Sequence, residues 1–134
     1  MFDQISRLLM TISNYMDFTE RLTINLINQA SNESINDLLN GIDNRERLIK
    51  IITKFNLTLE NSLSKIPAQE LKVLEVSLLK YWVKDLDAWK HRMGLLDEQL
   101  TLTVQELRDQ TRGEIRSTFD TRKKMDGYNL RSTK

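Results

Sequence analysis

Residues able to carry out chemistry are few in this chain of 134 residues. It contains no cysteine, which excludes disulfides and thiolate metal sites, and its four glycines lie too far apart to form a phosphate-binding loop. No serine occurs in the Gly-x-Ser-x-Gly pattern of a nucleophile elbow. The one histidine, His91, follows Asp87 by four residues, so a helix would present both side chains on one face.

A catalytic or metal-binding role for this pair would require partners that the sequence does not supply. A zinc site needs three or four ligands, and neither Glu-x-x-His nor His-x-x-x-His occurs. Polar pairs four residues apart commonly stabilise a surface helix by a small amount. We therefore expect no enzymatic activity, no metal and no cofactor.

The C-terminal third carries a basic stripe. Arg108, Arg112 and Arg116 are spaced by four residues, and Arg122–Lys124 extends the series. Residues 108–134 include eight basic and four acidic side chains. Interleaved carboxylates are typical of a solvated helix face, whereas the basic excess indicates an electrostatic surface for an acidic protein partner. The net charge of +1 for the whole chain argues against nucleic acid as the main partner.

Apolar residues that recur every three or four positions predict the elements that carry these side chains. The first helix begins at Phe2 and continues for about 28 residues, or roughly 42 Å. A second helix follows the capping residues Ser31, Asn32 and Ser34 and extends towards Pro67, which the helix cannot cross easily.

The third segment starts at Pro67, and its apolar stripe, which includes Leu74, Leu78, Trp82 and Trp89, stays in phase through Gly94. Gly127 is predicted to end the helix. Continuous phase favours one very long helix, whereas compactness favours a turn near Arg92–Leu95 that would divide it into two antiparallel helices. The predicted fold is an all-α, up-and-down antiparallel bundle of three or four long helices. We expect the bundle domain to span residues 1–127 and a flexible C-terminal tail to span residues 128–134.

The third segment has more apolar residues than one neighbouring helix would bury. Val76, Leu79 and Val83 widen its apolar arc to roughly 200° of the helix circumference. The first helix has a similar surplus, which includes Met10 and Phe18. Either the third helix is central and contacted on two sides, or the surplus forms an exposed groove for a partner helix. The residues that we predict to bind protein are Val76, Leu79, Tyr81, Trp82, Val83, Leu100, Val104, Leu107, Arg108, Arg112 and Arg116.

Two stretches of the chain resemble flagellar type III export chaperones of the FliT and FlgN kind. The run Glu33–Ile52 is similar to the second-helix signature of that family, and the run Gly94–Tyr128 is similar to its long last helix. The residues that match in the first run are Leu39, Asp43, Arg45, Glu46, Leu48 and Ile49. The residues that match in the second run are Leu96, Asp97, Glu98, Leu100, Lys123, Lys124 and Tyr128.

The resemblance implies a cytoplasmic chaperone. Such a protein binds the amphipathic terminal helices of filament-cap or hook-associated proteins and delivers them to the flagellar export apparatus, including its ATPase components. The resemblance also implies that the last helix can fold over the binding groove as a lid. An electrostatic docking role for the same helix is the other interpretation.

Other features of the sequence fit a cytoplasmic location. The N-terminal residues lack the pattern of a signal peptide, and no window approaches the length of apolar sequence that a membrane span requires. Surplus apolar faces should drive self-association, so we expect a homodimer or a concentration-dependent mixture. The alternative function is a coiled-coil structural or adaptor protein that acts through homodimerisation.

Overall fold

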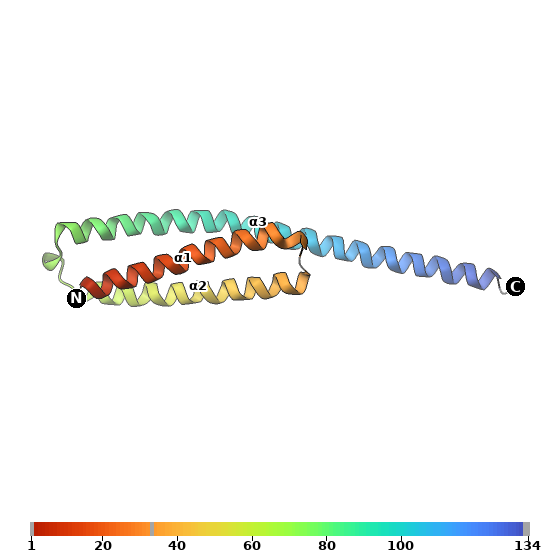
Figure 1. Ribbon diagram of the computed structural model, residues 1–134, viewed down its shortest axis with the longest axis horizontal. Coiled ribbons are helices and arrows are strands. Elements are labelled where there is room, and N and C mark those ends of the chain that lie inside the picture. Colours follow the sequence, from red (N-terminus) through yellow and green to blue (C-terminus); the bar gives the residue numbers. More distant parts are fainter. Residues whose placement is uncertain (1, 33, 133–134) are drawn as a thin grey trace.

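The structure is a computed structural model that describes residues 2–32 and 34–132, with side chains described as far as Thr121. Its elements are three long helices, α1, α2 and α3, joined by two short connections (Figure 1). Neighbouring helices in the chain run in opposite directions, so α1 and α3 are parallel and α2 is antiparallel to both. The predicted all-α, up-and-down bundle is confirmed.

The helix bounds follow the sequence signals closely. Helix α1 spans Phe2–Gln29, α2 spans Ile35–Ser64 and α3 spans Val73–Ser132. One turn of 3-10 helix, η1 at Ala30–Asn32, connects α1 to α2, and a second, η2 at Ala68–Glu70, lies before α3.

Local side-chain chemistry fixes where α2 and α3 begin. The Ser34 side chain accepts a hydrogen bond of 3.1 Å from the backbone N–H of Asp37, as expected for a helix N-cap. In the same way, the Glu75 carboxylate accepts a bond of 2.9 Å from the backbone N–H of Lys72 at the start of α3. Pro67 follows the end of α2, where its ring prevents the helix from continuing.

Helix α3 is one continuous helix of 60 residues, which corresponds to about 90 Å. Gly94 lies inside it, where an added Cβ would meet no other atom within 4 Å, and the helix passes through Arg92–Leu95 without a turn. The helix also continues through Gly127 to Ser132, and the prediction that it ends at Gly127 is wrong. A glycine of ordinary helical conformation lowers helix stability but does not end a helix.

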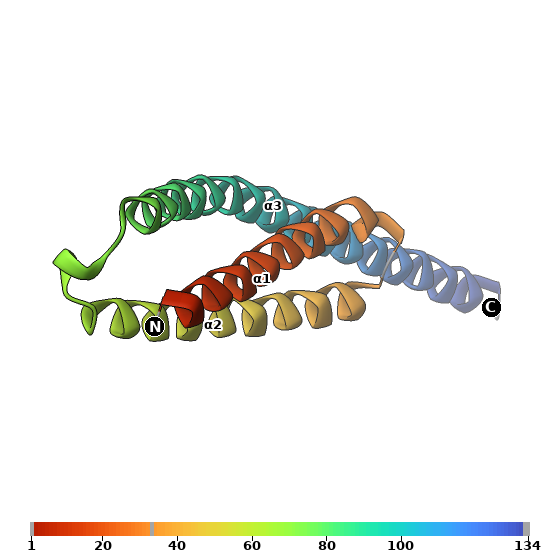
Figure 2. The ribbon, with the colours of Figure 1, turned by 60° about the vertical axis from the view of Figure 1, so that its left-hand side comes forward.

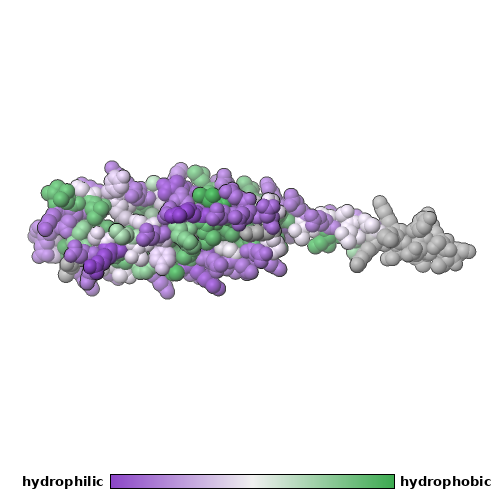
Figure 3. Space-filling view, viewed as in Figure 1, coloured by the Kyte–Doolittle hydropathy of each residue, from purple (hydrophilic) through white to green (hydrophobic). Residues whose placement is uncertain are grey.

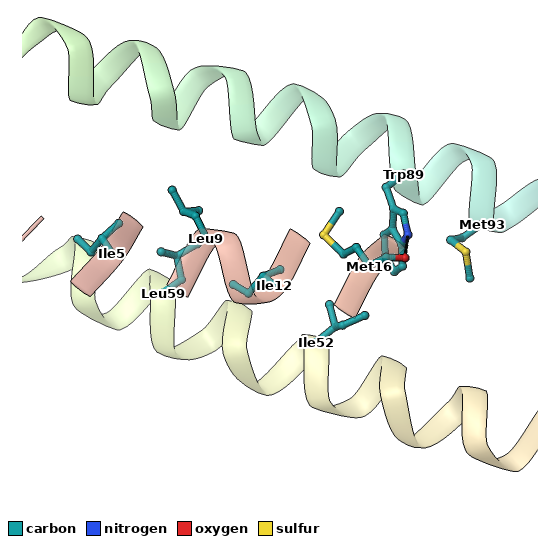
Figure 4. Packing of buried hydrophobic residues seen from close by; sticks show 8 residues of the cluster. All are labelled: Ile5, Leu9, Ile12, Met16, Ile52, Leu59, Trp89 and Met93. Carbon is teal, nitrogen blue, oxygen red and sulfur yellow. Dashed lines mark hydrogen bonds between the residues drawn. The ribbon is translucent and has the colours of Figure 1, made fainter. Parts of the chain in front are cut away.

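Helix α1 is the central helix of the bundle. It packs against both α2 and α3, which make few contacts with each other (Figure 2). Its buried residues alternate by four and three positions, the heptad spacing of a coiled-coil seam. These residues are Ile5, Leu9, Ile12, Met16, Thr19, Thr23, Leu26 and Ala30. Figure 4 shows several of them directed towards Ile52 and Leu59 of α2 and Trp89 and Met93 of α3.

The packing of α3 against the bundle ends at Leu107. Leu100, Val104 and Leu107 belong to the second core cluster, around Leu26 and Leu38, whereas every residue from Arg108 to Thr121 is exposed. Beyond Leu107, α3 projects alone from the bundle (Figure 1). In this structure the segment does not fold back over the other helices, so it is not in the lid position. The expected flexible tail at residues 128–134 includes residues 133 and 134, which lie outside the described residues.

Candidate functional site

The candidate site is an apolar groove between the first half of α1 and the first third of α3. It holds a cavity of about 310 Å³. The residues that line this α1–α3 groove are Ser6, Leu9, Met10 and Ser13 from α1, and Leu78, Tyr81, Trp82 and Asp85 from α3. Leu9 is buried and Trp82 is half-buried, so these two form the floor, while the more exposed residues form the walls.

The walls of the groove are unusually apolar for an exposed surface. Met10 is 67% exposed, Tyr81 68% and Leu78 43%. Leu74 precedes Leu78 by one turn and is 83% exposed, as is its neighbour Val73 at 82%. Leu74, Leu78 and Tyr81 follow the i, i+4, i+7 spacing of a single helix stripe. Figure 3 shows apolar atoms gathered at the end of the bundle where α3 begins. Contiguous apolar surface of this kind is typical of an interaction site.

Two polar contacts beyond the groove, on the side of Asp85, tie α3 to α1. The indole Nε1 of Trp89 donates a buried hydrogen bond of 2.9 Å to the backbone carbonyl of Met16. Arg92 then binds both carboxylate oxygens of Glu20, with Nε–Oε1 at 2.7 Å and Nη2–Oε2 at 3.3 Å. Hydrogen bonding to Glu20 raises the pKa of Arg92 above its usual value. Helix α3 is therefore fixed to α1 at Trp89 and Arg92, whereas the first turn of α3, at Val73 and Leu74, is exposed.

A polar layer around Arg45 holds all three helices together. Arg45 of α2 occupies a core position of the heptad pattern and is only 3% exposed, although its side chain is charged. Its Nε donates to Thr23 Oγ1 of α1 at 2.8 Å, and its Nη2 pairs with Asp97 of α3. Nη1 donates to Glu46 at 3.0 Å. Burial, partly offset by the Glu46 carboxylate, lowers the pKa of the Arg45 guanidinium below its usual value.

Buried threonines complete this layer and divide the hydrophobic core. Thr19 and Thr23 are 0% exposed, and each hydroxyl donates to the backbone carbonyl four residues earlier, at 2.7 and 2.8 Å. On one side of the layer lies the cluster around Ile12 and Trp89, and on the other lies the cluster around Leu26 and Leu100. Polar groups at core positions of a coiled coil commonly fix the register of the helices.

The residues predicted to bind protein fall into three groups. Leu100 is 5% exposed and belongs to the core, so it is not available to a partner in this structure. The half-buried residues that pack against the core are Leu79, Trp82, Val104 and Leu107. Val76 is also half-buried, and the exposed members are Tyr81, Val83, Arg108, Arg112 and Arg116. Only Tyr81 and Trp82 of the predicted set line the α1–α3 groove.

Sequence reasoning misses most of the groove. It identifies Met10 as surplus apolar surface of the first helix, but it assigns Leu74 and Leu78 to the core stripe of the third segment. Both lie in phase with Trp82 and Trp89, so periodicity alone places them on the buried face. Their exposure depends on how far α1 extends beside the first turns of α3, which periodicity does not encode.

A second, shallower cavity lies between α1 and α2. It measures about 400 Å³ and is lined by Thr11, Asn14, Tyr15, Phe18 and Leu48. Tyr15, which lines the cavity, stacks on Phe55 of α2 with ring centroids 5.7 Å apart. Phe18 is 57% exposed at its rim. The cavity has one large exposed apolar side chain, against three in the α1–α3 groove.

The remaining candidates for chemistry lie on the surface. His91 and Asp87 are both exposed on α3. No group of three or more His, Cys, Asp or Glu side chains capable of holding a metal ion occurs among the side chains that the structure describes. Within the described ranges, no helix combines the length and the apolar character needed to cross a bilayer.

Comparison with known proteins adds no assignment, since no protein-family model, curated protein or solved structure matches this chain.

Proposed function

We propose that this protein is an export chaperone that holds an amphipathic helix of a client protein in the α1–α3 groove. The observation that carries the proposal is the exposure of Leu78 and Tyr81 in a groove that also exposes Met10, with Leu74 continuing their stripe towards the start of α3. A client helix laid along this groove would bury its apolar face against these side chains, at about 25 cal/mol per Å² before entropy costs. The resemblance to FliT-like and FlgN-like chaperones supplies the class of client, which is a terminal helix of a filament-cap or hook-associated protein, and the cytoplasmic location.

The floor of the groove adds a polar argument for an occupant. The indole Nε1 of Trp82 is buried and has no hydrogen-bond partner among the described residues. An unsatisfied buried donor costs roughly 1–3 kcal/mol. Tyrosine and tryptophan are also the side chains that most often dominate protein–protein interfaces. A small rotation of the Trp82 ring towards an acceptor on the client would remove this cost on binding.

The alternative function, a coiled-coil adaptor that acts through homodimerisation, is less well supported. Its seam would have to come from the heptad positions of α3, and α1 already covers these from Leu79 to Leu107. At the next positions of the same series the sequence has Gln110 and Glu114, which give no apolar seam. The expected dimer in the absence of client remains a prediction, and the α1–α3 groove is the face that would form it.

A binding experiment with matched variants tests the proposal. Peptides that carry the terminal helices of filament-cap and hook-associated proteins are titrated into the full-length chain by isothermal calorimetry. Leu78→Glu places a charge in the groove at a side chain that is already 43% exposed, so folding is spared. We expect the affinity to fall by at least tenfold, on the order of a hot-spot residue.

Leu57→Glu is the matched control, because Leu57 is 56% exposed on α2 and does not line the groove. The control should bind as the unaltered chain does, and circular dichroism should show the same helix content in both variants. An equal loss of peptide affinity in the two variants would show that the peptide does not bind in the groove. Failure of every peptide to bind at high micromolar concentration would refute the proposed class of client.

A further inference from the structure

The projecting part of α3 carries three arginines in a line. Arg108, Arg112 and Arg116 are exposed, and each lies about 6 Å along the helix axis from the next. None of the three forms an ion pair with any side chain described up to Thr121. We call them the arginine stripe. The stripe begins one residue after the last bundle contact, at Leu107, so it lies on a surface separate from the α1–α3 groove.

The two flanks of the stripe differ in chemistry. At 100° per residue, Ile115 and Phe119 lie beside it on one flank, and they are 64% and 67% exposed. The same arithmetic places Asp109 and Asp120 on the other flank, and Glu114 on the far side of the helix. The stripe and its apolar flank therefore form a basic and apolar face on an otherwise acidic helix segment.

This arrangement opposes the stability of the helix that carries it. Arg108–Arg112 and Arg112–Arg116 are like-charged pairs at i, i+4, and each such pair destabilises an isolated helix by about 0.2–0.5 kcal/mol. The segment has no tertiary contacts to compensate, since every residue from 108 to 121 is exposed. Two opposite-charged pairs in the segment, Asp109–Arg112 at i, i+3 and Arg116–Asp120 at i, i+4, offset part of this cost by their spacing.

We propose that the arginine stripe docks an acidic amphipathic helix of a second protein partner. Carboxylates at four-residue spacing on that helix would match the 6 Å repeat of the guanidinium groups, which bind carboxylates bidentately. An apolar residue beside them would cover Ile115 and Phe119. Both partners could be bound at once, because Tyr81 in the groove and Arg112 in the stripe are 31 residues apart on one helix, or about 46 Å.

Interleaved carboxylates favour a protein over a polyanion. Residues 108–121 contain three arginines and three carboxylates, whereas residues 122–134 add five basic residues and one acidic residue, so carboxylates balance the arginines only beside the stripe. Asp109 and Asp120, on one flank of the stripe, would repel the phosphates of a membrane or nucleic acid. A protein helix can place its carboxylates on the arginines alone. In a dimer formed through this segment, Ile115 and Phe119 would be the large apolar side chains buried from the described residues. The surface area that they bury is far smaller than the roughly 1,200 Å² of a stable interface.

The test uses the full-length chain carrying Leu78→Glu, so that the α1–α3 groove does not take up the peptide, and a labelled helical peptide with three glutamates spaced by four residues and a leucine beside each. A second peptide has glutamine in place of each glutamate. Fluorescence anisotropy should show binding of the glutamate peptide that weakens as salt rises, and no binding of the glutamine peptide. Equal binding of the two peptides, or none of the glutamate peptide, would overturn the proposal.

Arg112→Glu separates docking from helix stability. The substitution converts both like-charged pairs into opposite-charged ones and places a carboxylate three residues after Asp109, so circular dichroism should show about equal helix content, while affinity for the glutamate peptide falls by about tenfold. The control, Gln110→Glu with Ser117→Glu, makes the same change in net charge away from the stripe and should retain the affinity. Equal loss in the control would overturn the proposal in favour of a non-specific charge effect. Binding to phosphatidylserine vesicles that Arg112→Glu abolishes, without binding to the peptide, would replace the protein partner with a membrane.

Discussion

Arg45 provides a quantitative test of how the bundle is held together. Replacing it with alanine removes a side chain that is 3% exposed. Alanine keeps the Cβ, so two buried methylenes, Cγ and Cδ, are lost, and this costs about 1.6 kcal/mol at 0.8 kcal/mol each. A further few tenths of a kcal/mol come from the lone pair of Thr23 Oγ1 that accepts from Arg45 Nε at 2.8 Å and loses its donor. We therefore expect Arg45→Ala to lower the free energy of unfolding by about 2 kcal/mol.

Arg45→Met isolates the electrostatic part of the same site, because methionine retains most of the aliphatic stem. The carboxylates that pair with Arg45 belong to Glu46 and Asp97, whose side chains are 55% and 52% exposed, so water solvates both when the arginine is removed. Each pair contributes at most about 1 kcal/mol under these conditions. The desolvation penalty of the buried guanidinium is of the same order or larger. We expect Arg45→Met to change stability by less than about 1 kcal/mol in either direction.

Urea unfolding followed by circular dichroism and by tryptophan fluorescence measures both variants. The two signals should give one coincident transition in each, since the polar layer lies inside a single packed unit. A loss of about 2 kcal/mol or more in Arg45→Met as well would refute the reasoning, because the ion pairs would then be strong net stabilisers. A loss below about 1 kcal/mol in Arg45→Ala would show that Arg45 is not packed as described.

Three further outcomes follow from the same structure. Gly94→Ala should raise the free energy of unfolding by about 1 kcal/mol, because a Cβ there meets no neighbour within 4 Å. Gly41→Ala should lower the free energy of unfolding by about 1 kcal/mol, because a Cβ there would overlap Leu26 Cδ2 in the core. Thermal melts that give changes of the same sign for both variants would contradict this packing. Trp89→Ala should lower the free energy of unfolding by about 3–5 kcal/mol, since the ring is buried and its Nε1 bonds to α1; a melting temperature within 2 °C of the unaltered chain, on the order of 0.5 kcal/mol, would refute a core role. Removal of Ser117–Lys134 should leave the affinity for a client helix unchanged in calorimetry, because this segment projects away from the groove, and stronger binding would instead favour a lid.

The helices were predictable because their signals are local. Heptad-like spacing, the Ser34 cap and Pro67 each act within a few residues, and they locate α1 and α2 to within three residues of their observed bounds. The prediction that α3 ends at Gly127 was wrong for a physical reason. A C-cap glycine needs a left-handed conformation, and no described glycine has a positive φ.

The sites were less predictable because they depend on how far a neighbouring helix extends. Periodicity identifies the apolar face of α3, but it does not show that Leu74 and Leu78 lie beyond the cover of α1, or that Leu100 lies beneath Leu26 and Leu38. Burial of Arg45 had a sequence signal that could have been used. It lies seven residues after Leu38 and seven before Ile52, so a charged residue occupies a core position of the heptad series.

Continuity of α3 connects the two proposed surfaces. The Trp89–Met16 hydrogen bond, the Arg92–Glu20 pair and the Arg45–Asp97 pair all lie on α3 between the α1–α3 groove and the arginine stripe. These contacts anchor the middle of the helix to α1 and α2 and leave both of its ends free. A client in the groove and an acidic partner on the stripe would therefore be held on one rigid rod, at a separation set by helical rise and not by a flexible linker. While these contacts hold α3 in place, no element between the two surfaces can switch between two packed arrangements. Binding of a client in the groove should therefore leave the affinity of the arginine stripe for its partner unchanged, and the reverse should also hold. A coupling between them larger than about twofold would require the polar layer to rearrange, and Arg45→Met would then change that coupling while the separate affinities stay the same.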